Sequence, residues 1–307
     1  MRDTDGVFRS QRTRSINALH REAKTDLLCE DILRFHATGK REINTFKIRK
    51  RRHGYRVISE PLGEYKVILQ KANTLFRTAL FHSVFNPKAP LKKLSTLAHV
   101  FNSHSKNCGV INAGHKLRAF TKLPIVIKVD LKDAFSSVTR DMINQQLIKA
   151  AQQSRHSPVH ITSVLLECMD LFFHPEKQEL LPQGFPTSPI IFNSCATAVD
   201  RSIQGSDIFG ASVCKDHWDY FRYLDDILLI LKANCFASPP ITNFRTAIEK
   251  AIRRAGFRIN RNKTRFMTSG HVSRAWKGHV EPSVKVLGLI SDNMKQHMRP
   301  GKKEINK

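Results

Sequence analysis

The sequence predicts an α+β protein, because segments with helical spacing alternate with short apolar runs that are typical of strands. Ile125–Asp130 is rich in β-branched residues and predicts a buried strand. Arg140–Ala151 and Ile190–Ile203 instead have the spacing of helices. The composition of the 307-residue chain, with 41% hydrophobic and 25% charged residues, is that of a globular protein and excludes a wholly disordered one.

The N-terminal part of the sequence predicts a helix and then a basic β-hairpin. The apolar residues of Ser15–Phe35 can share one helical stripe. Residues 40–56 carry eight Lys or Arg and a single acidic residue, and His53-Gly54 interrupts this run as a turn would. We therefore expect strand arms at Ile43–Ile48 and Tyr55–Ser59, with basic residues at the tip.

The remainder of the chain predicts further helices and a second hairpin. Phe221–Leu224 and Ile227–Leu231 are short apolar runs separated by Asp225-Asp226, which indicates a tight hairpin with carboxylates at its tip. Pro239-Pro240 is typical of a helix start, and Gly256 of a helix stop near residue 255. Two other helices are expected over Lys66–Phe81 and Ile161–Phe173.

The charge of the chain points to a polyanionic partner. The formal net charge is +25 and the pI about 10.2, which suits either nucleic acid or a membrane surface. No apolar run approaches the roughly 20 residues of a membrane-spanning helix, and the N-terminus lacks the apolar region of a secretory signal. The six cysteines are widely spaced and form no zinc-binding pattern with the 14 histidines. We therefore expect a cytoplasmic protein with reduced thiols.

Three carboxylates are the main candidates for chemistry. Asp225-Asp226 lies between apolar strands, where two adjacent carboxylates are costly to bury unless a divalent cation joins them. A solvated turn is the alternative. Asp130 ends the buried strand 95 residues earlier and converges with them if the strands are neighbours in one sheet. Such a site would bind two metal ions for in-line phosphoryl transfer.

Two further features lie near the predicted strand and helix ends. Asp133, three residues after Asp130, is either a fourth acidic residue of the site or a helix N-cap. In the segment Leu181–Pro189, Gly184 permits close backbone approach, and Gln183 offers an uncharged hydrogen bond. The alternative interpretation of this segment is an ordinary loop that leads into a helix.

Five motifs follow one another along the chain. They are Tyr55–Pro61, Val129–Phe135, Leu181–Pro189 with Asn193, the Tyr223-Leu224-Asp225-Asp226 box, and Gly256–Thr264. In this order the chain resembles the prokaryotic reverse transcriptases, most closely the retron-type group, over roughly residues 45–292. The resemblance implies a right-hand polymerase fold of the α+β class, with fingers, a ferredoxin-like palm and a short or abbreviated thumb.

The resemblance also implies roles for individual residues. Asp130 and Asp225 would hold two Mg²⁺ ions, or Mn²⁺ in their place, with Asp226 assisting. Lys263 would neutralise or protonate the departing pyrophosphate, and Phe135 would exclude a ribose 2′-OH and so favour dNTPs. Other nucleotide contacts are implied for Lys50, Arg56, Asp133, Gln183 and Gly184, and RNA contacts for Asn112, His115, Arg253, Arg254, Arg258 and Arg261.

Two retron marks occur in altered form. Asn112-Ala113-Gly114-His115 is one residue shorter than the NAxxH element of the family, and Val286-Leu287-Gly288 replaces its VTG sequence. Leu224 stands where Ala is common in the YxDD box. These departures concern the subgroup and leave the polymerase assignment intact. The chain ends 19 residues after Gly288, so we expect an abbreviated thumb or a surface supplied by another chain.

The domain organisation implied by the resemblance has four regions. We expect an N-terminal helical segment at 1–40, fingers at 41–120 that interleave with the palm, a palm at 121–268 and a short basic thumb or tail at 269–307. The expected partners are a structured non-coding RNA template, dNTPs, the RNA–DNA product and a protein that supplies thumb or effector function. No membrane partner is expected.

The sequence thus predicts an RNA-directed DNA polymerase that copies part of a dedicated structured RNA, and the family suggests a role in anti-phage defence. An untemplated or protein-primed defence polymerase would keep the same carboxylates and is an alternative. A group II intron-type enzyme is disfavoured because no maturase or endonuclease extension is present. A non-catalytic RNA-binding scaffold is disfavoured because it would have no need of three costly carboxylates.

Overall fold

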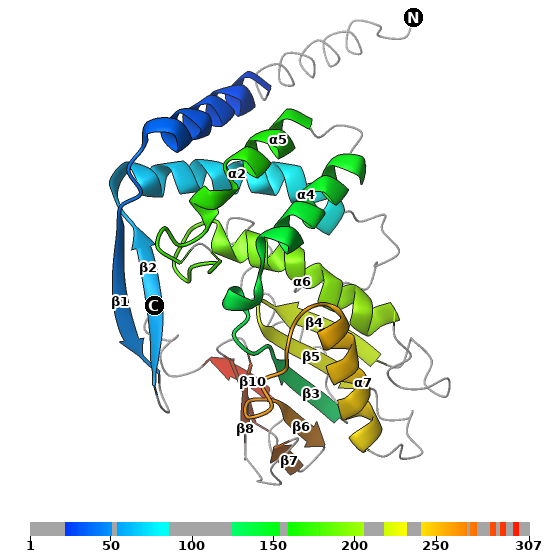
Figure 1. Cartoon of the computed structure of the whole chain (residues 1–307). Helices are drawn as coiled ribbons and strands as arrows, with labels where there is room; N and C mark the ends of the chain where they lie inside the picture. Colours follow the sequence, from blue (N-terminus) through cyan, green and yellow to red (C-terminus); the bar gives the residue numbers. More distant parts are fainter. Residues whose placement is uncertain are drawn as a thin grey trace, which may run out of the picture. The chain divides into compact units, whose positions relative to one another are not determined.

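The chain forms two compact units in the computed structural model (Figure 1). The first comprises Met1–Val84 and Thr139–Ile191, and the second comprises Phe85–Val138 and Phe192–Lys307. The structure describes residues 22–50, 54–85, 125–153, 159–177, 179–205, 218–231, 241–268, 271–274, 283–286, 289–292 and 297–300. Among the helices of these ranges, none is long and apolar enough to cross a membrane.

The first unit consists of helices and one β-hairpin. Its elements are a helix over residues 22–38, β1 (Ile43–Arg49), β2 (Tyr55–Pro61), α2 (Gly63–Phe85), α4 (Arg140–Gln153), α5 (Val159–Glu167) and the 3-10 helix η3 (Met169–Phe172). The two strands pair antiparallel from Ile43 opposite Pro61 to Arg49 opposite Tyr55, which confirms the predicted basic hairpin. The helix predicted over Lys66–Phe81 is present within α2, and the helix predicted over Ser15–Phe35 is present from residue 22, its earlier part lying outside the described residues.

The core of the first unit gathers around Tyr65 of α2. Its ring stacks on Phe35 at 5.7 Å and meets Phe185 edge-on at 5.6 Å, and its hydroxyl donates to the carbonyl of Leu171 at 2.6 Å. Asp170 lies beside this contact and pairs with Arg41 and with His36. These contacts join the first helix, α2 and η3.

The single helix predicted over Ile161–Phe173 is wrong in its second half. The α-helix ends at Glu167 and a 3-10 turn follows. Leu171, Phe172 and Phe173 are all fully buried. Three consecutive residues cannot share one face of an α-helix, because successive side chains are about 100° apart. The tighter turn lets this run enter the core, where Phe172 packs edge-on against Phe76 at 4.8 Å.

The second unit contains a five-stranded antiparallel sheet with strand order β4-β5-β3-β6-β7. Its strands are β3 (Ile125–Asp130), β4 (Trp218–Tyr223), β5 (Asp226–Leu231), β6 (Arg265–Thr268) and β7 (His271–Arg274). Helix α6 (Ser188–Gly205) precedes β4, and α7 (Ile241–Arg254) lies between β5 and β6 in the chain. In Figure 1, α7 lies across one face of the sheet. Apart from the first-unit helices that lie between β3 and α6 in the chain, the order is strand, helix, strand, strand, helix, strand, the βαββαβ succession.

The central position of β3 explains its apolar sequence. It pairs with β5 on one side and β6 on the other, and its described core residues Ile127 and Val129 are fully buried. Side chains alternate between the two faces of a strand. Lys128 and Asp130 therefore lie on the face opposite to Ile127 and Val129, and register places Asp226 of β5 on the same face as Asp130.

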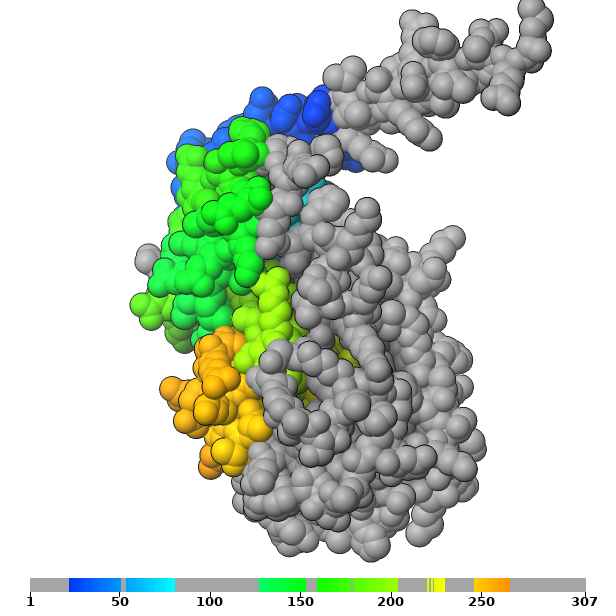
Figure 2. All heavy atoms as spheres, turned by 90° about the vertical axis from the view of Figure 1, so that its right-hand side faces the viewer, coloured from blue at the N-terminus to red at the C-terminus, as the bar shows by residue number. Residues whose placement is uncertain are grey.

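Helix α7 ends where the sequence predicts. Gly256 has φ +83, its N–H donates to the carbonyl of Arg253 at 3.0 Å, and the N–H of Phe257 donates to the carbonyl of Ile252 at 3.1 Å. These two bonds form a Schellman motif, which favours Gly at this position. Ile252 is buried, whereas Arg253 and Arg254 are exposed. Figure 2 shows the later part of α7 and the residues that follow it, in gold and orange, at the molecular surface.

The C-terminal part adds a separate three-stranded antiparallel sheet. Its strands β8 (Ser283–Val286), β9 (Leu289–Asp292) and β10 (His297–Pro300) have the order β10-β9-β8. Among the described cysteines, Cys29, Cys168 and Cys195 are free and buried, as expected for reduced thiols.

Candidate active site

The hairpin of β4 and β5 meets the end of β3 at the three predicted carboxylates. Asp130 lies directly opposite Asp226, which in turn pairs with Tyr223 across the hairpin. Leu224 and Asp225 form the two-residue turn between the strands. The N–H of Leu131 donates to the carbonyl of Asp225 at 3.0 Å and so fixes the turn against β3. The predicted convergence of Asp130 with Asp225-Asp226 is thus present in the backbone.

The backbone around these carboxylates is unusual. Among the described residues other than Gly, only Asp133 and Leu224 have positive φ, at 48° and 51°. Both flank the carboxylates, one after β3 and one in the hairpin turn. Residues held in this sparsely populated region cost about 1–3 kcal/mol each and cluster at functional sites. Asp133 tolerates this conformation better than Leu224 does, since short polar side chains bond locally to the backbone.

The electrostatics of the site favour a bound cation. Asp130 is buried, and its Oδ1 atom accepts no hydrogen bond from any described residue. Burial raises the pKa of Asp130, against the opposing effect of Lys263. Burial, and then the charges of Asp226 and Asp130, raise the pKa of Asp225 to about 6. Carboxylates with raised pKa values near one another are anions that lack sufficient counter-charge.

Two lysines supply part of that counter-charge. Lys263 Nζ lies 3.2 Å from Asp130 Oδ2 and is mostly exposed. Lys128, diagonal to Asp226 on the same face of the sheet, places its Nζ 2.8 Å from Asp226 Oδ1. Lys263 contacts Oδ2 of Asp130, and the buried Oδ1 of the same carboxylate accepts no hydrogen bond from the described residues, so it is available to another positive group.

The donor set fits a hard divalent cation. Mg²⁺ prefers carboxylate oxygens and binds through one or two carboxylates together with phosphates and water. Asp130 Oδ1 is such an oxygen, buried and without a donor among the residues described. Within the same part of the chain, no three His, Cys, Asp or Glu side chains form a complete metal-binding cluster. The residues that would hold such an ion are Asp130 and Asp225, which lie close enough for the charge of Asp130 to raise the pKa of Asp225, while Asp226 is paired with Lys128.

Comparisons with known proteins identify the family of the chain. Residues 48–291 match the family described as reverse transcriptase (RNA-dependent DNA polymerase). The chain belongs to the reverse transcriptase family. It is 25% identical over 249 residues to the retron Mx65 reverse transcriptase of Myxococcus xanthus, covering 75% of this chain and 49% of the relative. It is 26% identical over 182 residues to the retron Ec73 reverse transcriptase of Escherichia coli, covering 59% of this chain and 51% of the relative. The chain thus spans about half the length of these curated relatives.

Solved structures support the polymerase fold. Two structures of apo telomerase from Candida tropicalis, one truncated at its C-terminal domain, match with a TM-score of 0.50 and 14% sequence identity. Each match covers 85% of this chain and 54% or 48% of the telomerase chain. At this identity the likeness concerns the fold alone. The chain therefore has a reverse transcriptase fold of mixed helix and strand.

The second unit also contains the predicted sugar gate of this reverse transcriptase. Phe135 begins the short 3-10 helix η2 (Phe135–Ser137) and is partly exposed. Its ring stacks on Phe192 of α6 at 5.0 Å with an interplanar angle of 28°, and Phe192 meets Phe257 edge-on at 5.9 Å. A supported but partly exposed ring can present an edge to a ligand, whereas a core aromatic would be fully buried.

Of the other predicted nucleotide contacts, Asp133 belongs to the second unit and the remaining four to the first. The N–H of Ser59 donates to the carbonyl of Gln183 at 2.8 Å. Gly184 has φ +119, and a Cβ there would lie 2.6 Å from the carbonyl oxygen of Ser59. The close approach predicted for Gly184 is therefore made, and its partner is strand β2. Lys50 and Arg56 lie on the exposed tip of the same hairpin.

The predicted RNA contacts fall into two groups. Arg253, Arg254, Arg258 and Arg261 are exposed around the end of α7, where Glu249 pairs with Arg253 and Arg261. Asn112 and His115 lie outside the described residues.

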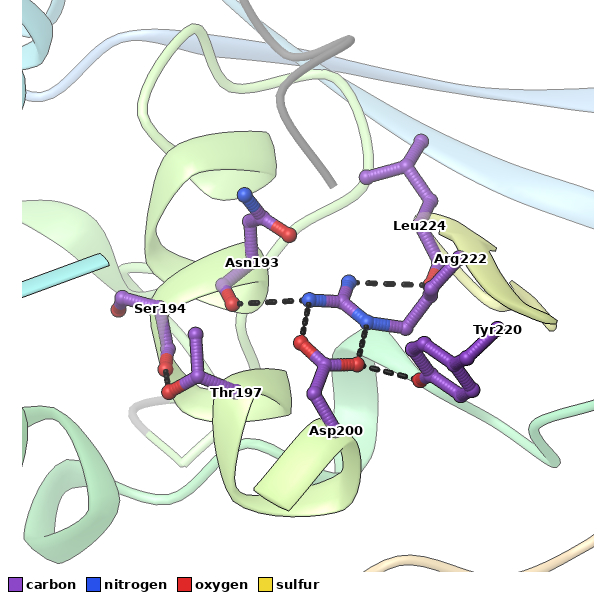
Figure 3. A network of polar contacts seen from close by, with 7 residues as sticks. All are labelled: Asn193, Ser194, Thr197, Asp200, Tyr220, Arg222 and Leu224. Carbon is purple, nitrogen blue, oxygen red and sulfur yellow. Dashed lines mark hydrogen bonds and ion pairs between the residues drawn. The ribbon is translucent and has the colours of Figure 1, made fainter. Parts of the chain in front are cut away.

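Sequence reasoning missed a buried network behind the hairpin. Asp200 of α6 pairs with Arg222 of β4, and Tyr220 donates to the same carboxylate (Figure 3). It also missed Lys128, whose partner Asp226 is 98 residues away in sequence. An arginine or lysine inside an apolar strand was the available signal, because burial of a charge requires a partner.

Proposed function

We propose that this reverse transcriptase is an RNA-directed DNA polymerase of the retron type, which copies part of a dedicated structured non-coding RNA into DNA. The observation that carries the proposal is the register of β3 and β5. It sets Asp130 opposite Asp226, beside the turn that holds Asp225, in a chain whose family is reverse transcriptase. Three relatives that bear the name retron reverse transcriptase support the subgroup.

The proposed chemistry is two-metal nucleotidyl transfer. Asp130 and Asp225 would hold the ions, Mg²⁺ or Mn²⁺, and Asp226 would assist. When bound, the ions would supply charge stabilisation for an in-line displacement at phosphorus. Lys263 lies next to Asp130 and is exposed enough to reach a ligand, so we assign it to neutralising or protonating the pyrophosphate. Phosphoryl transfer depends on such positioning and charge more than on covalent chemistry.

The choice of deoxynucleotides is assigned to Phe135. Its ring is held by Phe192 and would meet a 2′-hydroxyl. Phe135→Ala should incorporate rNTPs more readily, by about 10- to 200-fold relative to wild type, the range that a hydrophobic pocket contact provides. Competition between dNTP and rNTP in single-nucleotide extension measures this ratio. Unchanged sugar discrimination would remove the role. Further nucleotide contacts are assigned to Lys50, Arg56, Asp133, Gln183 and Gly184.

The domain assignment follows from the two sheets and the hairpin. We assign the βαββαβ sheet to the palm within 121–268 and the β1–β2 hairpin to the fingers within 41–120. Residues 1–40 are proposed as the N-terminal helical segment, and 269–307 are proposed as the short thumb or tail.

The proposed RNA partner matches the charge. With a net charge of +25, the chain should bind nucleic acid through phosphate contacts, with an affinity that falls steeply as salt rises. The exposed arginines around the end of α7 are candidates for such contacts, and shape and 2′-OH groups would provide selectivity for RNA. A protein partner and a role in antiviral defence rest on the resemblance to the family.

The test begins with nucleic acid that copurifies with the protein from its native host, sequenced with and without RNase and DNase treatment. One discrete RNA joined to or paired with a short DNA copy is the expected result. Asp225→Asn should keep the RNA and abolish the DNA. The matched control is Asp141→Asn, the same change at an exposed carboxylate in the first turn of α4.

Each other outcome points elsewhere. DNA without an RNA complement would favour untemplated or protein-primed synthesis. Heterogeneous RNA without DNA would favour a non-catalytic scaffold. Primer extension by Asp225→Asn at the wild-type rate with Mg²⁺ would refute the metal assignment.

A further inference from the structure

Arg222 lies at the centre of the buried network in the second unit (Figure 3). Its Nε and Nη2 atoms donate to the two carboxylate oxygens of Asp200 at 2.6 and 2.7 Å. Tyr220 donates its hydroxyl to Asp200 as well. The side chains of Arg222 and Asp200 are fully buried. This planar, two-bond geometry is specific to a guanidinium, and the ammonium of Lys cannot reproduce it.

The guanidinium also donates two hydrogen bonds to backbone carbonyls. Nη2 donates to the backbone carbonyl of Asn193 in α6 at 3.4 Å, and Nη1 donates to the backbone carbonyl of Leu224 at 3.3 Å. In Figure 3 the Arg222 side chain lies between Asp200 on one side and the carbonyl of Leu224 on the other. The network thus connects α6 to the turn between β4 and β5.

This turn is strained at the residue that Arg222 holds. Leu224 has φ +51 at the first position of a two-residue hairpin turn, where glycine, asparagine or aspartate is preferred. The second position is Asp225, whose own carbonyl accepts from Leu131. Both carbonyls of the turn are therefore fixed by donors from outside it, one from β4 and one from the end of β3.

The location of Arg222 separates it from the reacting groups. Alternation along β4 places Arg222 and Tyr220 on one face of the sheet, and register places Asp226 and Asp130 on the other. A buried ion pair is also weak evidence for stability, because well-packed apolar residues often serve as well. Beyond the ion pair, an apolar replacement would lose the bonds to the carbonyls of Asn193 and Leu224, and of these two the bond to Leu224 is the one that reaches the turn.

We propose that Arg222, oriented by Asp200, is a positioning residue that holds Leu224 in the left-handed conformation and thereby sets Asp225 beside Asp130. The inference rests on the proposed function, since Asp225 is a metal ligand only there. It assigns no contact between Arg222 and substrate. The α6 network acts on the metal site through one backbone carbonyl.

The test is a double-mutant cycle between positions 222 and 224. Arg222→Lys keeps the charge but cannot bridge Asp200 and Leu224, and should weaken Mn²⁺ binding and lower kcat by about 10- to 100-fold, as outer partners of metal ligands do. The KM for dNTP should stay within about twofold, since no ligand contact is lost. Leu224→Asn places a residue that tolerates positive φ in the turn and should restore part of both losses in the double variant.

The readouts do not all require polymerisation. Mn²⁺ affinity is measured by EPR on the protein alone, and hydrogen exchange reports the Leu131 amide that bonds to Asp225. The matched control is Tyr220→Phe, which removes a bond to the same carboxylate without touching Leu224. It should lower the melting temperature and leave Mn²⁺ affinity unchanged. If Arg222→Lys does not fold, Asp200→Asn takes its place in the cycle.

Two results would overturn the proposal. One is a loss of stability in Arg222→Lys with Mn²⁺ affinity and Leu131 exchange as in wild type. The other is strict additivity with Leu224→Asn, which would mean that Arg222 acts independently of the turn. A wild-type protein that makes no DNA, but shows the coupling in Mn²⁺ binding and exchange, would refute the proposed function and leave the positioning role standing.

Discussion

Asp130 and Asp200 are both buried aspartates of the second unit, and their surroundings are opposite. Asp200 accepts bonds at both oxygens from Arg222 and Tyr220. Asp130 has a donor only at Oδ2, from the mostly exposed Lys263, and its Oδ1 is left without one among the described residues. The carboxylate of Asp200 is therefore saturated, in the sense that both of its oxygens accept hydrogen bonds from the protein, whereas the carboxylate of Asp130 is unsaturated.

The difference shows how one residue type serves two purposes in one sheet. Asp200 and its partners lie against the face of the sheet that carries Arg222, while Asp130 lies on the face that carries Asp226. A saturated buried carboxylate stabilises one conformation, and an unsaturated one raises its own pKa and attracts a cation. The measurements below should therefore separate the two residues, with activity responding at Asp130 and stability at Asp200.

The largest effect is expected for Asp130→Asn. Loss of a ligand anion should lower the rate of DNA synthesis by at least about 10³-fold, since metal stabilisation of the transition state contributes several kcal/mol. The free energy of unfolding should stay within about 0.5 kcal/mol of wild type or rise, because the exposed pair with Lys263 contributes little. Single-turnover extension and urea unfolding measure the two quantities. An Asp130→Asn variant that is destabilised but active would contradict the expected difference between Asp130 and Asp200.

Asp200→Asn should lower the free energy of unfolding more than it lowers the rate of DNA synthesis. The amide leaves the fully buried Arg222 without its counter-charge, which costs about 3–5 kcal/mol of stability when one partner of a buried pair is lost. Urea unfolding and hydrogen exchange in α6 and β4 test this. The rate of DNA synthesis should fall only to the extent that Arg222 no longer holds the turn at Leu224. A stability equal to that of wild type would show that the saturation of Asp200 has no energetic consequence.

A smaller effect is expected at Lys263. Lys263→Met removes the cation next to Asp130 and, if the lysine assists pyrophosphate departure, should slow synthesis by about 10²-fold, the contribution of a general acid. Stability should change by less than about 0.5 kcal/mol, as is usual for exposed sites. Lys177→Met, at an exposed lysine of the first unit, is the matched control. Equal rates for both variants would remove Lys263 from the mechanism.

The sequence predicted the unsaturated site better than the saturated one. β3, the Asp225-Asp226 hairpin and the stop of α7 at Gly256 each depend on local patterns of apolar residues and turn residues, and the structure confirms them. The Asp200–Arg222 pair joins residues 22 positions apart on a helix and a strand. The position of Arg222 inside an apolar strand indicates that it has a partner, but nothing in the local sequence identifies Asp200 as that partner. The break in the helix after Glu167 depends on core contacts with Phe76 and Tyr65. These two residues are distant in sequence, so the local sequence around Glu167 does not predict the break.

The smallest effect concerns pH and follows from Asp225. Its pKa is raised to about 6 by burial and by Asp226 and Asp130, so a proton competes with the cation there. The apparent Mg²⁺ affinity should fall about twofold at pH 6 and about tenfold at pH 5 relative to pH 8.

The same carboxyl should stabilise the folded protein at low pH when Mg²⁺ is absent. Its pKa is about 6 in the folded state and 3.8 in the unfolded state, so the free energy of unfolding should rise as the pH falls from 6 towards 3.8. Saturating Mg²⁺ should remove this gain in stability. Melting temperatures of wild type and Asp225→Asn, with and without Mg²⁺, isolate this carboxyl from the histidines. An identical pH profile for the two proteins would mean that Asp225 is solvated and that the contrast with Asp200 rests on Asp130 alone.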